Sequence, residues 1–291
     1  MKQMKKVKRV LPVLLVAALA LSMLAGCDSG NGGANSGSSE GGSDKTYVIA
    51  TDTTFAPFEF TNEQNEFVGI DVDILAAVAE DQGFEYDLQP LGFEAACTAV
   101  STGQADGVIA GMSITEDRMK DYDFSESYYE STVCASVAQD SDITDLEGLR
   151  GQSVAVKTGT QSAAWAESIK DEYGLTLNYY DDSAMMYQEV KTGNSVACFE
   201  DYPVMAYGVS QNNGMRIIAE ESEEYATPYG FAVRKGENAE LIEMFNAGLA
   251  NIKANGTFDE IIAKYLGSSD AAGDAADADA AGSAEGTNAA A

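Results

Sequence analysis

Four short clusters of polar residues could supply binding chemistry in this chain, because each directly follows an apolar run typical of a buried strand. In a sheet of parallel strands, ligands bind beyond the carboxyl ends of the strands, so these clusters are expected to meet at one edge. The clusters occupy residues 51–58, 111–118, 157–161 and 200–203.

Two charged side chains in these clusters have the chemistry to hold a free amino acid. The planar guanidinium of Arg118 can take an α-carboxylate through two parallel hydrogen bonds. The hydroxyls of Ser113 and Thr115, together with the first amides of a following helix, favour the same anion. Asp201 can hold the α-ammonium group at the other end of the molecule.

Each candidate also has a plainer explanation. Arg118 could belong to a solvated, charged helix start, and Asp201 could be a helix N-cap. Lys157 could be a surface lysine at a strand end. Phe55 and Phe93, which could wall a side-chain pocket, could equally belong to the core. The interpretation therefore depends on the agreement of the four clusters and not on any single residue.

The elements that must position these clusters alternate between strand and helix, which predicts an α/β fold of parallel sheets flanked by helices. Similar segments at 100–105 and 190–195 each close a helix before a buried strand, which indicates two lobes of similar construction. The expected strands lie at 47–50, 107–110, 153–156, 175–180 and 196–199, and the expected helices begin at about 70, 93, 161 and 184.

Charge and composition exclude several classes of function. The chain of 291 residues has 17 Lys and Arg against 47 Asp and Glu, for a net charge of −30. Such a field repels phosphate backbones and argues against nucleic-acid binding. The sequence contains no histidine, which removes Ser-His-Asp and Cys-His mechanisms and the commonest zinc ligand. Neither a metal nor a cofactor is expected.

The first residues predict export and anchoring. A basic start precedes an apolar run, as in a secretory signal peptide at 1–26, and the residues Leu-Ala-Gly-Cys ending at Cys27 resemble a lipoprotein cleavage box. A lipid on Cys27 would anchor the protein to the extracytoplasmic face of the cytoplasmic membrane. Residues 27–44 are rich in Gly and Ser and are expected to be a flexible tether, and 268–291 are expected to be a disordered acidic tail.

Three cysteines remain beyond the cleavage box: Cys97, Cys134 and Cys198. Their wide spacing and odd number allow at most one disulfide. Buried free thiols are the default expectation, and a bridge between Cys134 and Cys198 stays open.

Several segments in order carry a resemblance to a known family. They read VIATDTTFAPFEF, FVGIDVDILAAVAE, GVIAGMSITEDRMKDYDFSESYYES, VAVKTGTQS and ACFEDYPV. Together they resemble the bacterial polar-amino-acid-binding proteins of ABC importers (family 3 solute-binding proteins), in particular those that bind glutamine. The resemblance implies a periplasmic-binding-protein-like fold of type II that closes on a free amino acid and delivers it to a membrane permease. It also implies a monomer that is not an enzyme.

The resemblance further implies how the chain is divided. Residues 45–127 plus 230–267 would form lobe 1, and 133–224 would form lobe 2. Two hinge strands, at 128–132 and 225–229, would join the lobes.

Carried over position by position, the resemblance gives Arg118 the ligand carboxylate and Asp201 the ligand ammonium. Two positions depart from the glutamine-binding proteins, because Glu200 stands in place of histidine and Gln161 in place of glycine. The implied ligand-binding residues are Asp52, Phe55, Phe93, Ala110, Gly111, Ser113, Thr115, Arg118, Lys157, Thr160, Gln161, Glu200 and Asp201.

These departures leave two ligands in view. Asp52 and Glu200 against Lys157 give one excess negative charge, which could suit arginine or lysine. An unneutralised Lys157 beside a cationic ligand would be costly, whereas Lys157 and Asp52 together match the acceptor and donor of an amide. Glutamine or a similar polar amino acid is therefore expected, with basic amino acids as the alternative. A periplasmic dehydratase-like enzyme, with Glu200 or Lys157 as acid or base, is a weaker alternative, as is a sensory receptor.

Overall fold

A computed structural model of the protein describes residues 45–221 and 223–267. The predicted signal peptide and tether, including Cys27, and the predicted tail at 268–291 lie outside the described residues. Everything below therefore concerns the part of the chain that carries the four polar clusters.

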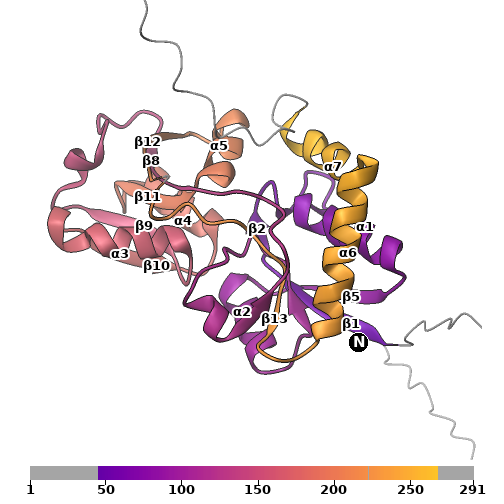
Figure 1. Ribbon diagram of the computed structural model, residues 1–291. Coiled ribbons are helices and arrows are strands. Elements are labelled where there is room, and N and C mark those ends of the chain that lie inside the picture. The colour runs from indigo at the N-terminus through magenta and orange to yellow at the C-terminus, as the bar shows by residue number, and fades with distance from the viewer. Residues whose placement is uncertain (1–44, 222, 268–291) are drawn as a thin grey trace, which may run out of the picture. The chain divides into compact units, whose positions relative to one another are not determined.

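The first sheet contains five strands. Its members are β1 (Thr46–Thr51), β5 (Glu85–Pro90), β6 (Gly107–Val108), β7 (Tyr122–Phe124) and β13 (Ala232–Arg234). Their order in space is β5-β1-β6-β13-β7 (Figure 1). β1 pairs in parallel with β5 and β6, whereas β13 runs antiparallel to β6 and β7. The sheet is therefore mostly parallel, with one reversed strand.

The second sheet repeats this plan. Its members are β8 (Val133–Ala138), β9 (Ser153–Lys157), β10 (Thr176–Tyr180), β11 (Ala197–Asp201) and β12 (Met215–Glu221). Their order is β10-β9-β11-β8-β12, and β8 is antiparallel to both of its neighbours. The expected α/β fold with two similar lobes is confirmed, and in each lobe the fourth strand in space runs against the other four.

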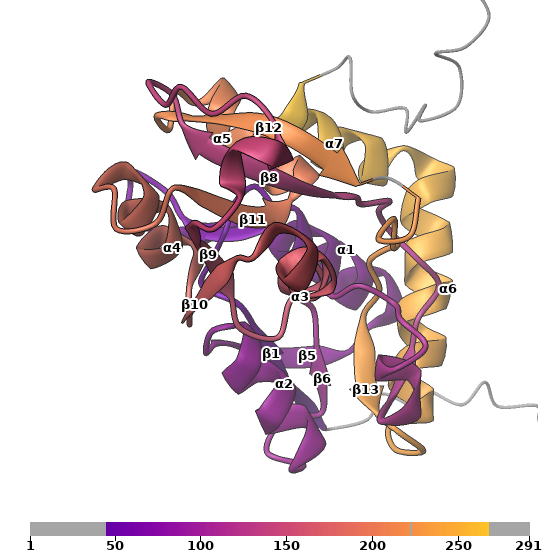
Figure 2. The same ribbon diagram turned by 90° about the vertical axis from the view of Figure 1, so that its left-hand side faces the viewer.

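Helices cover both sheets (Figures 1 and 2). They are α1 (Ile70–Gln82), α2 (Phe93–Ser101), α3 (Gln161–Tyr173), α4 (Ser183–Lys191), α5 (Tyr202–Ser210), α6 (Ala239–Asn255) and α7 (Thr257–Leu266), with the 3₁₀ turns η1 (Arg118–Lys120) and η2 (Leu146–Leu149). α1 packs on α6 and α7, α2 on β1, α3 and α4 on β9, and α5 on β12. None of these helices is long and hydrophobic enough to cross a lipid bilayer.

Local sequence signals explain where the helices of lobe 2 begin and end. The hydroxyl of Thr160 accepts a hydrogen bond of 3.2 Å from the amide of Ala163, which caps α3. The carboxylate of Asp182 does the same for α4 at 2.8 Å. Such caps satisfy amides that have no partner inside the helix. α3 ends at Gly174, whose φ of 64° is the left-handed conformation that glycine adopts without strain.

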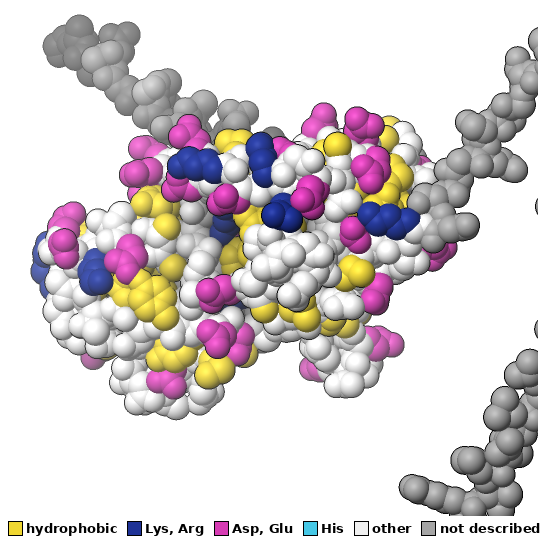
Figure 3. Space-filling model, turned by 90° about the horizontal axis from the view of Figure 1, so that it is seen from below, with side chains coloured by type: hydrophobic (Ala, Val, Ile, Leu, Met, Phe, Trp, Pro, Cys, Tyr) yellow, Lys and Arg dark blue, Asp and Glu magenta, His cyan; other side chains and the backbone are white. Residues whose placement is uncertain are grey.

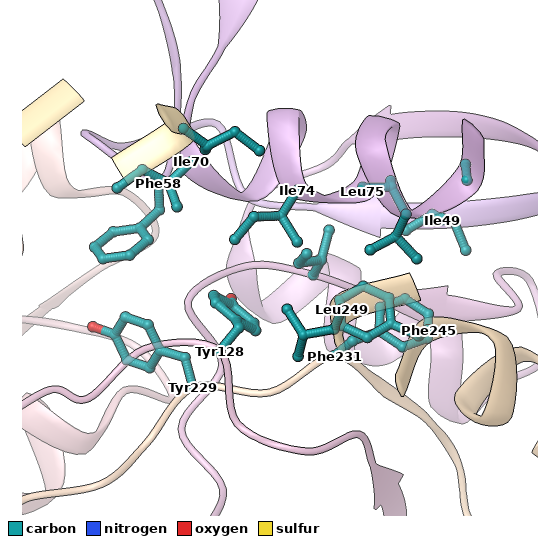
Figure 4. Packing of buried hydrophobic residues seen from close by; sticks show 14 of the residues in the cluster. Ile49, Phe58, Ile70, Ile74, Leu75, Tyr128, Tyr229, Phe231, Phe245 and Leu249 are labelled. Carbon is teal, nitrogen blue, oxygen red and sulfur yellow. The ribbon is translucent and has the colours of Figure 1, made fainter. Parts of the chain in front are cut away.

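Each lobe has its own apolar core. In the first, Ile70, Ile74 and Leu75 of α1 face aromatic side chains from the residue before β13 and from α6 (Figure 4). Phe231 and Phe245 stack there with ring centroids 4.7 Å apart. This packing follows from the helical spacing of the apolar residues in α1.

Two segments, at 128–132 and 225–229, run side by side between the sheets. The amide of Tyr229 donates to the carbonyl of Tyr129 at 2.8 Å, and the amide of Thr227 donates to the carbonyl of Ser131 at 2.9 Å. Of the strands given so far, those before 128 belong to the first sheet, those from 133 to 221 to the second, and β13 returns to the first. The chain thus passes between the sheets twice, through a short antiparallel pair.

A third, small sheet of three antiparallel strands lies beside α1. Its strands are β2 (Thr54–Phe55), β3 (Glu59–Thr61) and β4 (Phe67–Val68). No pattern in the sequence predicted it, because each strand has only two or three residues. Its first strand lies within the first polar cluster, and the other two follow that cluster in sequence.

The surface and the thiols agree with an ordinary globular body. On the face shown in Figure 3, acidic side chains are scattered among basic and apolar ones and do not form one patch. Cys97, Cys134 and Cys198 are free thiols, so the disulfide that the sequence left open between Cys134 and Cys198 is absent from the described part of the structure.

Candidate ligand-binding site

A small pocket lies where the ends of strands from both sheets meet. About 240 Å³ of empty space, partly open to solvent, lies among its lining side chains. Its lining residues are Asp52, Phe55, Phe93, Ala110, Gly111, Ser113, Arg118, Lys157, Thr160, Gln161 and Asp201.

Lobe 1 forms one wall of the pocket from the ends of β1 and β6. Asp52 and Phe55 follow β1, and Gly111 follows β6. Gly111 has a φ of 51°, and a Cβ built on it would lie 2.4 Å from the Phe55 ring. Glycine is required here because the aromatic ring packs directly against the backbone.

Lobe 2 forms the opposite wall from the ends of β9 and β11. Lys157 is the last residue of β9, Gln161 is the first of α3, and Asp201 is the last of β11. Thr160 lines the pocket, but its hydroxyl is already used as the cap of α3. The start of α3 therefore faces the pocket and favours a negative group there.

Arg118 reaches from lobe 1 across to lobe 2. Its Nη1 donates to the carbonyl of Ser113 at 2.8 Å, and its Nη2 donates to the carbonyl of Gly159 at 2.9 Å. The guanidinium also lies 5.2 Å from the centroid of the Phe93 ring. A guanidinium has five N–H donors, so Arg118 retains donors for an anion in the pocket.

Asp201 offers an unused acceptor. It is only 4% exposed, and its Oδ2 accepts a hydrogen bond of 2.5 Å from the Tyr229 hydroxyl. Its Oδ1 has no hydrogen-bond partner among the described residues. Burial, together with the neighbouring Glu200 carboxylate, raises the pKa of Asp201 to about 7. An unpaired buried carboxylate oxygen is costly. A ligand cation placed here would supply the hydrogen-bond donor that Oδ1 lacks.

Lys157 and Asp52 form a buried ion pair across the pocket, with both side chains 1% exposed. Burial by itself would lower the pKa of Lys157, but the carboxylates of Asp52, Glu200 and Glu59 together outweigh it and leave the pKa above its ordinary value. Asp52 also accepts a hydrogen bond of 2.7 Å from the amide of Thr53. Lys157 therefore keeps its charge beside Asp52 at one end of the pocket.

Two of the residues expected in the site do not line it. The Glu200 carboxylate faces the interior of lobe 2, where it accepts hydrogen bonds from the hydroxyls of Ser183 at 2.8 Å and Tyr187 at 2.7 Å. The hydroxyl of Thr115 accepts a hydrogen bond of 3.2 Å from the backbone amide of Arg118. The predicted excess of negative charge counted Glu200, which does not line this pocket.

Sequence reasoning missed Tyr229 and Ser131 as supports of the site. The Ser131 hydroxyl donates to the Tyr229 hydroxyl at 2.9 Å, and Tyr229 in turn donates to Asp201. Both residues come from the segments that pass between the sheets. A buried carboxylate implies a nearby donor, but nothing in the sequence indicates which residue supplies it.

Comparisons with known proteins agree with this architecture. The arginine-binding extracellular protein ArtP of Bacillus subtilis is 29% identical over 255 residues, covering 87% of this chain and 96% of ArtP. Substrate-binding domain 2 of GlnP from Lactococcus lactis, solved in an open conformation, is 41% identical with a TM-score of 0.54, covering 77% of this chain and 96% of that domain.

A third similar protein is an ancestral arginine-binding protein that has been solved with two ligands. Bound to arginine it is 36% identical with a TM-score of 0.71, and bound to glutamine the TM-score is 0.69. In both cases 76% of this chain and 98% of that chain are covered. Residues 47–268, nearly the whole described part, match the family described as bacterial extracellular solute-binding proteins, family 3. The chain therefore belongs to the family 3 extracellular solute-binding proteins and is an amino-acid-binding member of it.

Proposed function

We propose that the chain holds the zwitterion of a free amino acid between Arg118 and Asp201 and presents it to an ABC importer. The observation that carries the proposal is the unpaired Oδ1 of Asp201, which shares a pocket with the spare donors of Arg118. A ligand ammonium and a ligand carboxylate satisfy the two groups together. Neither group alone requires an amino acid, but the pair does.

Binding is coupled to closure of the two lobes because the groups that hold the ligand come from both. Three contacts already join the lobes: Arg118 to Gly159, Lys157 to Asp52, and the amide of Ser183 to the hydroxyl of Thr54 at 3.2 Å. The TM-score is higher to the ligand-bound ancestral protein than to the open domain of greater identity. Both observations support a closed arrangement, which a ligand stabilises by contacting both lobes.

The charges of the pocket favour a neutral side chain on the ligand. With Glu200 outside the lining, Arg118 and Lys157 balance Asp52 and Asp201. A zwitterion adds no net charge, so a neutral amino acid leaves the pocket balanced. The Lys157–Asp52 pair offers one donor and one acceptor to a side-chain amide, which supports glutamine.

A basic amino acid is the second candidate. The relatives that are named for arginine favour it, and the ancestral protein accommodates both arginine and glutamine. A cationic side chain would have to displace Lys157 from Asp52 or lie beside it, and two unscreened positive charges in a buried site repel each other.

A thermal-shift screen of the twenty amino acids against the protein separates the two candidates. Glutamine is expected to raise the melting temperature most, because a ligand that binds only the folded state stabilises it by mass action. Removing the lysine charge with Lys157→Met should weaken glutamine binding by roughly 5- to 150-fold and shift the preference towards arginine. The matched control is Lys170→Met on the exposed side of α3, which should leave the order unchanged. A wild-type preference for arginine over glutamine would contradict the choice of glutamine.

We further propose that Cys27 carries the lipid anchor and that 1–26 are removed on export. The family is described as extracellular, which places the binding site outside the cytoplasmic membrane.

A further inference from the structure

Two buried carboxyl groups, Glu59 and Asp71, lie next to each other outside the ligand pocket. Glu59 belongs to the small sheet and Asp71 to the first turn of α1, and both side chains are fully buried. The amide of Asp71 donates to the carbonyl of Phe58 at 2.9 Å, which brings the two elements together. Neither carboxyl group is among the groups proposed to contact the ligand.

The hydrogen bonding of this pair is incomplete unless it holds a proton. Both oxygens of Glu59 and Oδ1 of Asp71 have no donor among the described residues, yet the two carboxyl groups are within hydrogen-bonding reach of each other. Two carboxylates are acceptors only and would repel each other. A single proton between them supplies the missing donor and removes one of the two charges.

Glu59 is the member that keeps the proton. Oδ2 of Asp71 accepts hydrogen bonds from the amide of Gly111 at 2.7 Å and from the hydroxyl of Tyr128 at 2.8 Å, and such bonds favour a carboxylate. Glu59 has no comparable donors. Burial raises the pKa of Glu59 well above its ordinary value, and the Asp71 carboxylate raises it further. Burial also raises the pKa of Asp71, to about 6, with the Gly111 and Tyr128 bonds opposing the rise.

The charged and titratable groups that face Glu59 do not supply a free cation. Asp71 and Asp52 favour the protonated form, and the buried hydroxyl of Tyr128 is bonded to Asp71. Lys157 is the cation that opposes them, but it is engaged by Asp52. Protonation therefore remains the way to neutralise Glu59.

Asp71 connects the pocket to the segments between the lobes. Gly111 lines the pocket. Tyr128 begins the first passage between the sheets, and its amide donates to the carbonyl of Tyr229 at 3.0 Å. Tyr229 in turn holds Asp201. Oδ2 of Asp71 thus holds part of the pocket wall at Gly111. Through Tyr128 and Tyr229, it also supports the segment that positions Asp201.

We propose that protonated Glu59 donates a hydrogen bond to the Asp71 carboxylate, and that this acid–carboxylate pair positions Gly111 and Tyr128 for ligand binding. The coupling to ligand binding rests on the proposed function, whereas the shared proton does not. Glu59 and Asp71 are positioning residues, since neither lines the pocket.

The pair makes the stability of the ligand-free protein depend on pH, and the sign of this dependence is known. A carboxyl group whose pKa is raised by folding holds its proton longer in the folded state than in the unfolded state. Its contribution to stability is fully present below the unfolded pKa, about 4.5 for Glu59, and declines as pH rises towards the folded pKa. Asp201 contributes a decline of the same sign up to about pH 7, so the test compares variants rather than absolute slopes.

The test uses Glu59→Gln, which keeps a neutral donor of nearly the same shape, and Glu63→Gln in the exposed β3–β4 turn as the matched control. Ligand-free thermal unfolding is followed from about pH 5 to about pH 9. Glu59→Gln is expected to fold and to flatten the decline in melting temperature, while the control follows wild type. Infrared spectra near neutral pH should show a carboxylic-acid carbonyl band in wild type and the control, in addition to that of Asp201, and Glu59→Gln should lack this additional band.

Measurements of ligand affinity test whether the pair positions Gly111 and Tyr128. Glu59→Gln should bind the amino acid within about threefold of wild type, whereas Asp71→Asn should lose about tenfold or more because it weakens the bonds from Gly111 and Tyr128. Equal infrared bands and equal pH slopes in wild type and Glu59→Gln would overturn the shared proton. Normal affinity in Asp71→Asn would overturn the positioning. If wild type binds no amino acid, the proposed function fails, and the two ligand-free measurements still decide whether the proton is shared.

Discussion

Replacing Arg118 with alanine should weaken amino-acid binding by about 2–5 kcal/mol, or roughly 30- to 5,000-fold. In the variant, the ligand carboxylate no longer has the N–H donors of the guanidinium. The hydrogen bond from Arg118 to the carbonyl of Gly159 in lobe 2 is also lost. Both losses disfavour the closed, ligand-bound state. Titration calorimetry with the ligand chosen by the thermal-shift screen measures the change directly.

Two further variants show whether the loss belongs to the guanidinium. Arg118→Lys keeps a positive charge but loses the planar, bidentate geometry, so it should recover only part of the affinity. Arg234→Ala removes an arginine that is paired on the surface with Glu237 at 3.1 Å and should bind like wild type. Near-normal affinity in Arg118→Ala would contradict the site.

Replacing Asp201 with asparagine should act on binding and stability in opposite directions. Binding should weaken by about 2–5 kcal/mol, because the ligand ammonium loses its counter-charge. The ligand-free protein should be stabilised by an amount on the order of 1–3 kcal/mol at alkaline pH, since the variant no longer buries a carboxylate with an unpaired oxygen. Asparagine can still accept the hydrogen bond from Tyr229. Thermal unfolding without ligand, beside calorimetry with it, separates the two effects.

The same residue predicts how affinity depends on pH. With a pKa of about 7 in the empty pocket, Asp201 is mostly protonated below that pH. A bound ammonium favours the carboxylate, so binding should release a proton and affinity should fall as pH drops below about 7. Calorimetry in buffers of different ionisation enthalpy counts that proton, and Asp201→Asn should abolish its release. Affinity that is constant from about pH 5 to about pH 8 in wild type would contradict this assignment.

The architecture could be predicted from the sequence because its strands and helices follow from regular patterns of apolar residues. The apolar runs before Asp52 and Lys157 predicted the strands β1 and β9, and the rule for parallel sheets then placed the side chains after them at a common edge. The helical spacing in α1 similarly predicted its buried face. These signals are local, so a single sequence contains them.

The direction of the Glu200 side chain could have been predicted from the alternation of side chains along its strand. Successive side chains of a strand point to opposite faces, and Glu200 and Asp201 are both in β11. The alternation therefore favours only one of them on the side of the ligand. Thr115 similarly precedes Arg118 by three residues, a spacing at which a hydroxyl accepts from the backbone of a turn. Both signals are local and can be read from the spacing of the residues.

Other features depend on contacts between distant residues. The partnership of Tyr229 with Asp201 and that of Asp71 with Gly111 join residues 28 and 40 positions apart. Such pairings are fixed by how the two lobes and the segments between them pack. Sequence patterns predict that buried polar groups need partners, whereas the structure identifies them.

The central claim is that both charged ends of one amino acid are held at once, and competition calorimetry with derivatives of the preferred ligand tests it most directly. The N-acetyl derivative lacks the ammonium that Asp201 would hold, and the α-carboxamide lacks the carboxylate that Arg118 would hold. Each derivative is expected to bind at least about 100-fold more weakly than the parent amino acid. Binding of either derivative with the affinity of the parent would contradict the claim.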